Sequence, residues 1–276
     1  MMRRLLVFGM LVGLLAGLVA FGFASIAGEP QVDAAIALEE AAAQGEAVAP
    51  HSHGEDEAAA THSHEEPAEV SRSTQKGIGL AVATGLYGVA MGGLFAIACA
   101  VAYGRIGVPG MRATAATVAL VGFIAVALVP FLKYPANPPA VGNPDTIDRR
   151  TGLYVVMVLV SVLAALIAAQ VGRVLAGRSA GRGGGWNAWL ASAGAFTVLV
   201  TVAAVLLPVV NEVPVSFPAE LLWRFRLSSL GTQALVWVVL GLGFGPLAER
   251  VLNPSPARRT TALPVSASPA SSGTAG

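Results

Sequence analysis

The stretch "IGLAVATGLYGVAMGGLFAIACAVAY", residues 78–103, contains no Asp, Glu, Lys or Arg. A helix rises about 1.5 Å per residue, so this stretch is long enough to cross a hydrocarbon core of about 30 Å. Further charge-free stretches of similar length lie at residues 5–23, 113–132, 153–172, 188–210 and 230–247. The sequence therefore predicts an all-α integral membrane protein with about six transmembrane helices.

The composition of the chain supports a membrane protein and excludes several other classes. Charged residues make up 12% of the chain, about half the share of a soluble domain, and the mean hydropathy is +0.68. The net charge of +1 says nothing about nucleic acid, but the absence of a basic patch with interleaved aromatics indicates no nucleic-acid partner. No catalytic motif is present, so the sequence does not predict an enzyme. Membrane lipid is the expected surrounding partner.

Changes in composition divide the chain into four expected parts. Residues 1–27 form the first transmembrane helix, and residues 28–76 a flexible loop rich in His and Glu. Residues 77–252 form a five-helix membrane domain, and residues 253–276 a disordered cytoplasmic tail. The first part also fits a cleaved secretion signal, although its long apolar run favours a retained signal anchor. Within the loop we expect one short helix, Asp33–Gln44, capped by Asp33.

The charges of the loops predict the orientation of the chain in the membrane. With a cytoplasmic N-terminus, alternate loops place ten of the 17 basic residues inside the cell. The same arrangement places all of the 16 acidic residues except Glu249 outside. We therefore expect a multi-pass protein of the cell membrane with both termini cytoplasmic and the loop of residues 28–76 extracytoplasmic.

Glycines recur at regular spacing in the first two predicted helices. Gly9, Gly13 and Gly17 are four residues apart, which places them on one helix face, and further glycines crowd residues 77–93. Such a face allows the backbone of a neighbouring helix to approach closely. The alternative is the general enrichment of glycine in membrane helices.

The stretch "HSHGEDEAAATHSH", residues 51–64, holds all four histidines of the chain. In an extended segment, residues two apart point the same way, so each His-x-His pair can offer two imidazoles to one ion. Imidazole and carboxylate together suit cobalt, nickel, zinc or copper(II), and the pattern does not choose among them. The predicted ligands are His51, His53, His62 and His64 with Glu55, Asp56 and Glu57. The alternative is a polar linker that binds no metal.

Two further outer loops differ from ordinary connections. In residues 131–154, four prolines prevent regular helix and polar residues are concentrated, so we predict a structured pore mouth there. Its residues are Asn137, Asp145, Asp148, Arg149 and Arg150. The alternative is that the carboxylates only cap the next helix.

The second loop spans residues 211–233. Glu220 and Arg224 are four residues apart and can form a structural ion pair on a helix. Arg226 lies elsewhere around that helix and needs another partner, such as a lipid headgroup or another loop.

No ionisable residue lies inside the six charge-free stretches, apart from the single cysteine, Cys99, and tyrosines. Coupled carriers usually contain an intramembrane carboxylate or histidine. The pattern therefore favours a channel-type permease or one component of a larger system, with no resident cofactor and with the metal ion as cargo.

Three stretches carry a resemblance to a known family: "SRSTQKGIGLAVATGLYGVAMGGLF" (residues 71–95), "FLKYPANPPAVGNPDTIDRRTGLY" (131–154) and "FPAELLWRFRLSSLGTQ" (217–233). Together with the His-rich loop they resemble CbtA, a family of predicted cobalt transporter subunits, in its actinobacterial form, over most of residues 1–250. The resemblance implies uptake of cobalt for cobalamin synthesis and a small single-helix partner similar to CbtB. The alternative is a non-transporting membrane protein that buffers or senses metal or scaffolds a partner.

Overall fold

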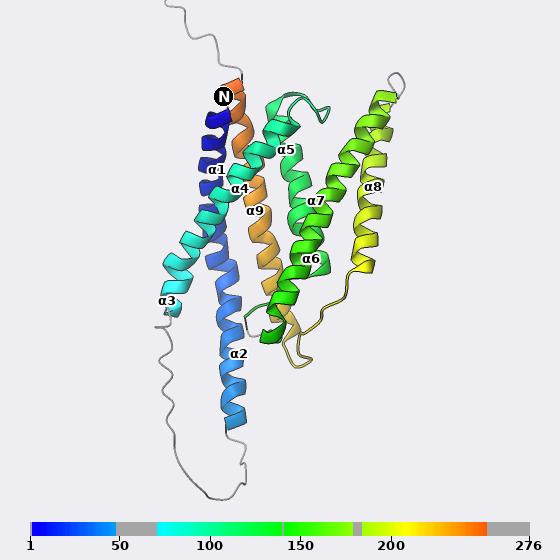
Figure 1. Ribbon diagram of the computed structural model, residues 1–276. Helices are drawn as coiled ribbons and strands as arrows, with labels where there is room; N and C mark the ends of the chain where they lie inside the picture. Colours follow the sequence, from blue (N-terminus) through cyan, green and yellow to red (C-terminus); the bar gives the residue numbers. More distant parts are fainter. Residues whose placement is uncertain (1, 48–70, 140, 179–183, 253–276) are drawn as a thin grey trace, which may run out of the picture.

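The computed structural model describes residues 2–47, 71–139, 141–178 and 184–252 (Figure 1). In these residues the fold is all-helical, and six helices are long and apolar enough to cross a membrane. The predicted fold class is therefore confirmed. The spans are Met2–Ala42, Arg72–Ala102, Gly110–Lys133, Ile147–Arg178, Gly185–Leu206 and Ala219–Leu252.

The first three spans each contain a π-helical turn, whereas the last three are regular. The first consists of α1 (Met2–Phe23), η1 (Ala24–Gly28) and most of α2 (Glu29–Ala47). The second consists of α3 (Arg72–Thr74), η2 (Gln75–Gly79) and α4 (Leu80–Ala102), and the third of α5 (Gly110–Gly122), η3 (Phe123–Leu128) and α6 (Val129–Lys133). They are followed by η4 (Pro144–Thr146), α7 (Ile147–Arg178), α8 (Gly184–Leu206) and α9 (Ala219–Leu252).

Helices α1, α4, α5 and α9 enclose the core of the bundle, and the α7–α8 pair lies to one side of it (Figure 1). Phe95 of α4 packs edge-on against Trp237 and Phe244 of α9, with ring centroids 6.4 and 5.7 Å apart. Helix α8 packs mainly on α7, so most of its apolar surface is exposed. In a bilayer such a surface faces lipid and needs no protein cover.

The closest helix pair is α1 with α4, which run antiparallel and meet at their glycines. A side chain added at Gly13 would come closer than 3.0 Å to the backbone of Gly88, and one added at Gly9 would do so at Gly92. Gly17 is equally close to Thr84. The interpretation of the glycine spacing as a close helix contact is therefore confirmed.

A missing hydrogen-bond donor in the third span explains how α7 is attached to the core. In a π-turn the carbonyl of residue i accepts from the N–H of residue i+5, and Val129 N–H bonds to Ile124 O in this way. The next carbonyl, of Ala125, would need a donor at Pro130, which has none. The fully buried hydroxyl of Ser161 in α7 donates to that carbonyl instead.

The predicted helix Asp33–Gln44 is longer in the structure, and the predicted cap at Asp33 is wrong. Helix α2 begins at Glu29 and continues α1 through η1, so no free N–H groups are left for a cap. Asp33 accepts instead from Arg72 (3.1 Å) and Lys76 (3.4 Å). Residues 48–70 and the expected tail, 253–276, lie outside the described residues.

The loops gather at two opposite ends of the bundle (Figure 1). At the N-terminal end lie the start of α1, the turn between α4 and α5, and the end of α9, where Arg112 and Glu249 form an ion pair at 2.6 Å. At the other end, called the loop end here, lie α2, the proline-rich loop before α7 and the linker between α8 and α9. The polar residues of the predicted pore mouth belong to the loop end.

Candidate functional site

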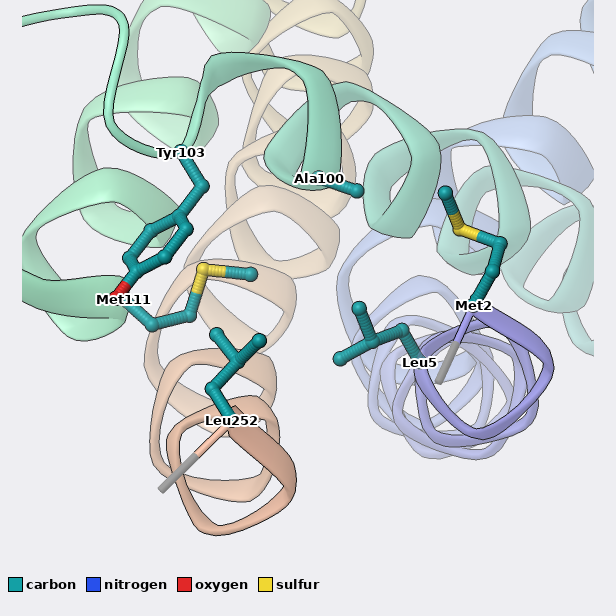
Figure 2. A pocket seen from close by; sticks show the side chains of 6 residues that line it. All are labelled: Met2, Leu5, Ala100, Tyr103, Met111 and Leu252. Atoms are coloured by element: carbon teal, nitrogen blue, oxygen red, sulfur yellow. The ribbon is translucent and has the colours of Figure 1, made fainter.

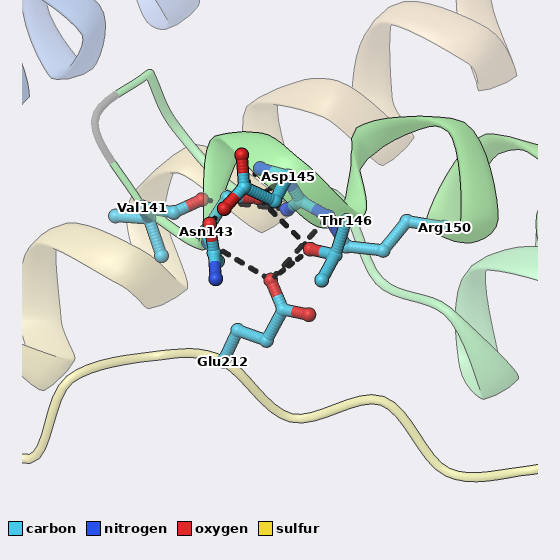
Figure 3. Close-up of polar contacts among 6 residues, drawn as sticks. All are labelled: Val141, Asn143, Asp145, Thr146, Arg150 and Glu212. Carbon is cyan, nitrogen blue, oxygen red and sulfur yellow. Dashed lines mark hydrogen bonds and ion pairs between the residues drawn. The ribbon is translucent and has the colours of Figure 1, made fainter.

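Glu212 joins the two outer loops at the loop end (Figure 3). It lies in the linker between α8 and α9, residues 207–218. Its Oε2 atom accepts from the backbone N–H of Asn143 (3.0 Å) and from the hydroxyl of Thr146 (2.8 Å). The same oxygen lies 3.5 Å from Nε of Arg150. One carboxylate oxygen thus connects the linker to the proline-rich loop and to the first turn of α7.

The surroundings of Glu212 favour its charged form. The hydrogen bond from Thr146, then the N–H of Asn143 and the charges of Arg150 and Arg149, hold the pKa of this carboxyl below its usual value. Nε of Arg150 is buried without a hydrogen bond, because 3.5 Å to Glu212 makes an ion pair without hydrogen-bond geometry. Two neutral donors and a loose ion pair therefore hold an ionised Glu212 in place.

The local backbone explains why these groups converge. Gly142 has a φ of +109°, a conformation that favours glycine, and a side chain there would meet the Arg150 guanidinium. The Asn143 side chain accepts from the N–H of Asp145 at 2.9 Å, which forms a turn leading into η4 and α7. The guanidinium of Arg150 also donates to the carbonyl of Asn143, at 3.3 Å. The turn thus aims donors at the position that Glu212 occupies.

A second set of contacts fastens the first half of the proline-rich loop. Arg226 of α9 donates to the carbonyl of Ala136 (3.2 Å) and to Oδ1 of Asn137 (2.9 Å). The hydroxyl of Tyr134 donates to the carbonyl of Pro208 at 2.8 Å. The additional partner expected for Arg226 is therefore the neighbouring loop, which α9 holds against the end of the bundle.

A polar pocket of about 210 Å³ lies beside the Glu212 contacts. It is lined by Arg149, Arg150, Val209, Val210, Asn211 and Glu212. With two guanidinium groups and one carboxylate, the pocket is not itself a strong site for a divalent cation. A hydrated ion would be attracted instead by the exposed carboxylates around it.

The five predicted mouth residues all lie at the loop end, but only two of them take part in these fastenings, Asn137 and Arg150. Asp145, Asp148 and Arg149 are exposed. Asp148 lies in the first turn of α7, where its charge also suits the helix dipole, so its capping role and a role at the mouth are compatible.

The predicted pair Glu220 and Arg224 forms an ion pair at 2.6 Å on the exposed surface of α9. Among the described residues, the proline-rich loop is fastened to α9 by Arg226 and not by this pair. The predicted metal ligands, His51, His53, His62, His64, Glu55, Asp56 and Glu57, lie outside the described residues. Within the part of the chain that the structure describes there is no group of three or more His, Cys, Asp or Glu that could hold a metal ion.

Sequence reasoning missed Glu212, together with Thr146 and Tyr134. The available signal was that Glu212 is the sole acidic residue between the ends of α8 and α9, set between prolines, while an Arg-Arg pair stands at the start of α7. Nothing in the spacing showed that these segments meet.

The N-terminal end of the bundle carries a pocket of a different kind, of about 190 Å³ (Figure 2). It is lined by Met2, Leu5, Ala100, Tyr103, Met111 and Leu252. Apart from one phenol and two thioethers the lining is aliphatic, which suits an apolar group better than a hydrated ion.

Comparison with known proteins places the chain in a family. A family model described as probable cobalt transporter subunit (CbtA) matches residues 2–249. No curated protein and no solved structure gave a match. The matched residues include the first five spans, the sixth span up to residue 249, the Glu212 contacts and the Arg226 contacts. The chain therefore belongs to the CbtA family of probable cobalt transporter subunits.

Proposed function

We propose that this chain is the membrane component of an uptake system for a divalent transition metal, cobalt first, with nickel and zinc as competitors. The family match over residues 2–249 carries the proposal. The structure supports it with six apolar spans and with polar loops that are fastened to each other at one end of the bundle.

In this proposal the loop end faces the extracytoplasmic side, and both termini are cytoplasmic. The charges of the loops support this orientation, because nearly all acidic residues then lie outside. His51, His53, His62 and His64, with the carboxylates between them, raise the local concentration of metal near the mouth. The exposed Asp145 and Asp148 receive the ion there.

Membership in a family of transporter subunits supports a second component. We propose a small partner with a single membrane helix, and cobalamin synthesis as the use of the metal, as the resemblance implies. Because no carboxylate or histidine lies within the apolar runs, this chain does not itself provide the usual groups for proton coupling.

Radiolabelled cobalt uptake into proteoliposomes tests the proposal, with this chain reconstituted alone and with its partner. We expect saturable uptake that nickel and zinc compete for, and none in empty vesicles. Binding of cobalt without transfer to the lumen, even with the partner present, would refute uptake and favour a membrane protein that buffers or senses metal.

A further inference from the structure

Three polar side chains from three different helices lie beneath the loop end, two of them in direct contact. The hydroxyl of Tyr87 in α4 donates to Oε1 of Gln233 in α9 at 3.1 Å. The hydroxyl of Tyr154 in α7 is near enough to that of Tyr87 to interact with it electrostatically. All three residues belong to apolar spans. We call Tyr87, Tyr154 and Gln233 the polar triad.

The polar triad is not sealed inside protein. Tyr87 is 40% exposed and Tyr154 is 38% exposed. The Tyr154 hydroxyl makes no hydrogen bond to any described residue, and the amide nitrogen of Gln233 likewise has no described partner. Lipid tails cannot hydrogen-bond, so polar groups exposed only to lipid would carry a substantial free-energy cost. Water at the triad would remove this cost.

The polar triad continues the loop end into the membrane. Gln233 follows Arg226 by seven residues on α9, which places it on the same helix face and about 10 Å deeper. Tyr154 follows Arg150 by four residues on α7, again on the same face and about 6 Å deeper. Both arginines hold the proline-rich loop. The two helix faces that carry the mouth therefore also carry the triad.

We propose that the polar triad is the first intramembrane station on the route of the metal ion, an inference that rests on the proposed uptake function. A hydrated divalent cation passes there from the loop end and exchanges part of its water for the neutral oxygens of Tyr87, Tyr154 and Gln233. Neutral oxygens bind such an ion weakly enough for it to leave again, as permeation requires. Deeper in the bundle, Phe95 packs edge-on against Trp237 within the apolar core.

Cysteine labelling tests the triad independently of transport. In a Cys99→Ala background, Gln233→Cys and Tyr87→Cys are exposed to an impermeant cationic methanethiosulfonate from outside. The reagent reacts only with a hydrated thiolate. Both cysteines should therefore react, because the proposal places water at the polar triad. Leu86→Cys is the matched control, since Leu86 precedes Tyr87 at nearly the same depth, is 67% exposed and is not part of the polar triad. It should not react, and cobalt should slow the reaction at Gln233→Cys.

Inert cysteines at both triad positions, or equal labelling at Leu86→Cys, would overturn the proposal. Transport then gives the second measurement: Gln233→Leu should lower the maximal rate of cobalt uptake at least several-fold, whereas Leu86→Ala should leave it unchanged at equal protein amount. Full uptake by Gln233→Leu would overturn the station while leaving the uptake function intact. Absence of uptake by the unaltered chain with its partner would instead refute the proposed function.

Discussion

Glu212 shows how much one side chain contributes at the loop end, because its Oε2 atom alone accepts hydrogen bonds from two residues of the proline-rich loop segment, 66 and 69 residues away in the chain. Glu212→Gln keeps the shape but removes the charge that Arg150 faces. We expect a lower Tm in detergent and faster proteolysis within residues 207–218. Glu220→Gln is the control, because exposed ion pairs contribute little and this variant should match the unaltered protein. Equal behaviour of the two variants would contradict the role of Glu212.

Ser161 is a second residue with a specific stabilising role. Ser161→Ala leaves the carbonyl of Ala125 without a donor in the apolar interior, which costs about 1–3 kcal/mol. Ser192→Ala is the control, because Ser192 donates to Ala188 within its own helix, where the backbone already supplies a donor. Thermal unfolding in detergent compares them. A Ser161→Ala protein as stable as Ser192→Ala would show that another donor replaces the hydroxyl.

The pH dependence of uptake should distinguish the histidines from Glu212. The pKa of Glu212 is lowered from 4.5 in the folded protein. Its stabilising effect is therefore complete above the unfolded carboxyl's pKa and is lost only as the pH falls through the lowered value. Histidines titrate near pH ~6.5 and must be neutral to bind metal. Acidification from neutral pH to a value below that midpoint should raise the cobalt concentration for half-maximal uptake without loosening the loop end.

Replacing His51, His53, His62 and His64 with Ala should raise the cobalt concentration for half-maximal uptake at neutral pH. It should also remove most of the pH dependence of that concentration. The maximal rate should stay nearly intact, because in the proposed function these residues raise the local metal concentration and do not form the path. Normal uptake at scarce metal would show that the segment is only a linker. Failure even at saturating metal would place the histidines in the translocation path itself.

At the scale of helices, the α1–α4 contact depends on glycines that bring two backbones together. Gly13→Leu forces a side chain into the backbone of Gly88, and overpacking of this kind costs about 1–3 kcal/mol or more. Gly22→Leu, on the same helix but with open space around it, should be tolerated. Thermal stability of the two variants in detergent measures the difference. Equal stability would mean that α1 and α4 separate without cost.

At the scale of the whole molecule, the orientation in the membrane can be tested with exposed positions at the two ends. In a Cys99→Ala background, Ser71→Cys and Asp145→Cys at the loop end should react with an impermeant reagent added to intact cells. Gly177→Cys, near the end of α7 at the opposite side of the bundle, should react only after permeabilisation. Val141, although it belongs to the proline-rich loop, is a poor probe because it is 6% exposed. Reaction at Gly177→Cys in intact cells would contradict this orientation.

The six helices follow from the sequence alone, because crossing a membrane depends on the length and apolarity of one segment and helical hydrogen bonds are local. The polar loops are also predictable from the sequence, because they are the segments between the apolar stretches. The family resemblance is predictable as well, because short stretches of residues carry it. The tertiary structure decided what depends on packing. It determined that Gly13 meets Gly88, that Asp33 faces Arg72 because η1 continues the helix, and that Glu212 and Arg226 hold one loop from two sides. These contacts join residues far apart in the chain, and their partners are set by how the helices pack.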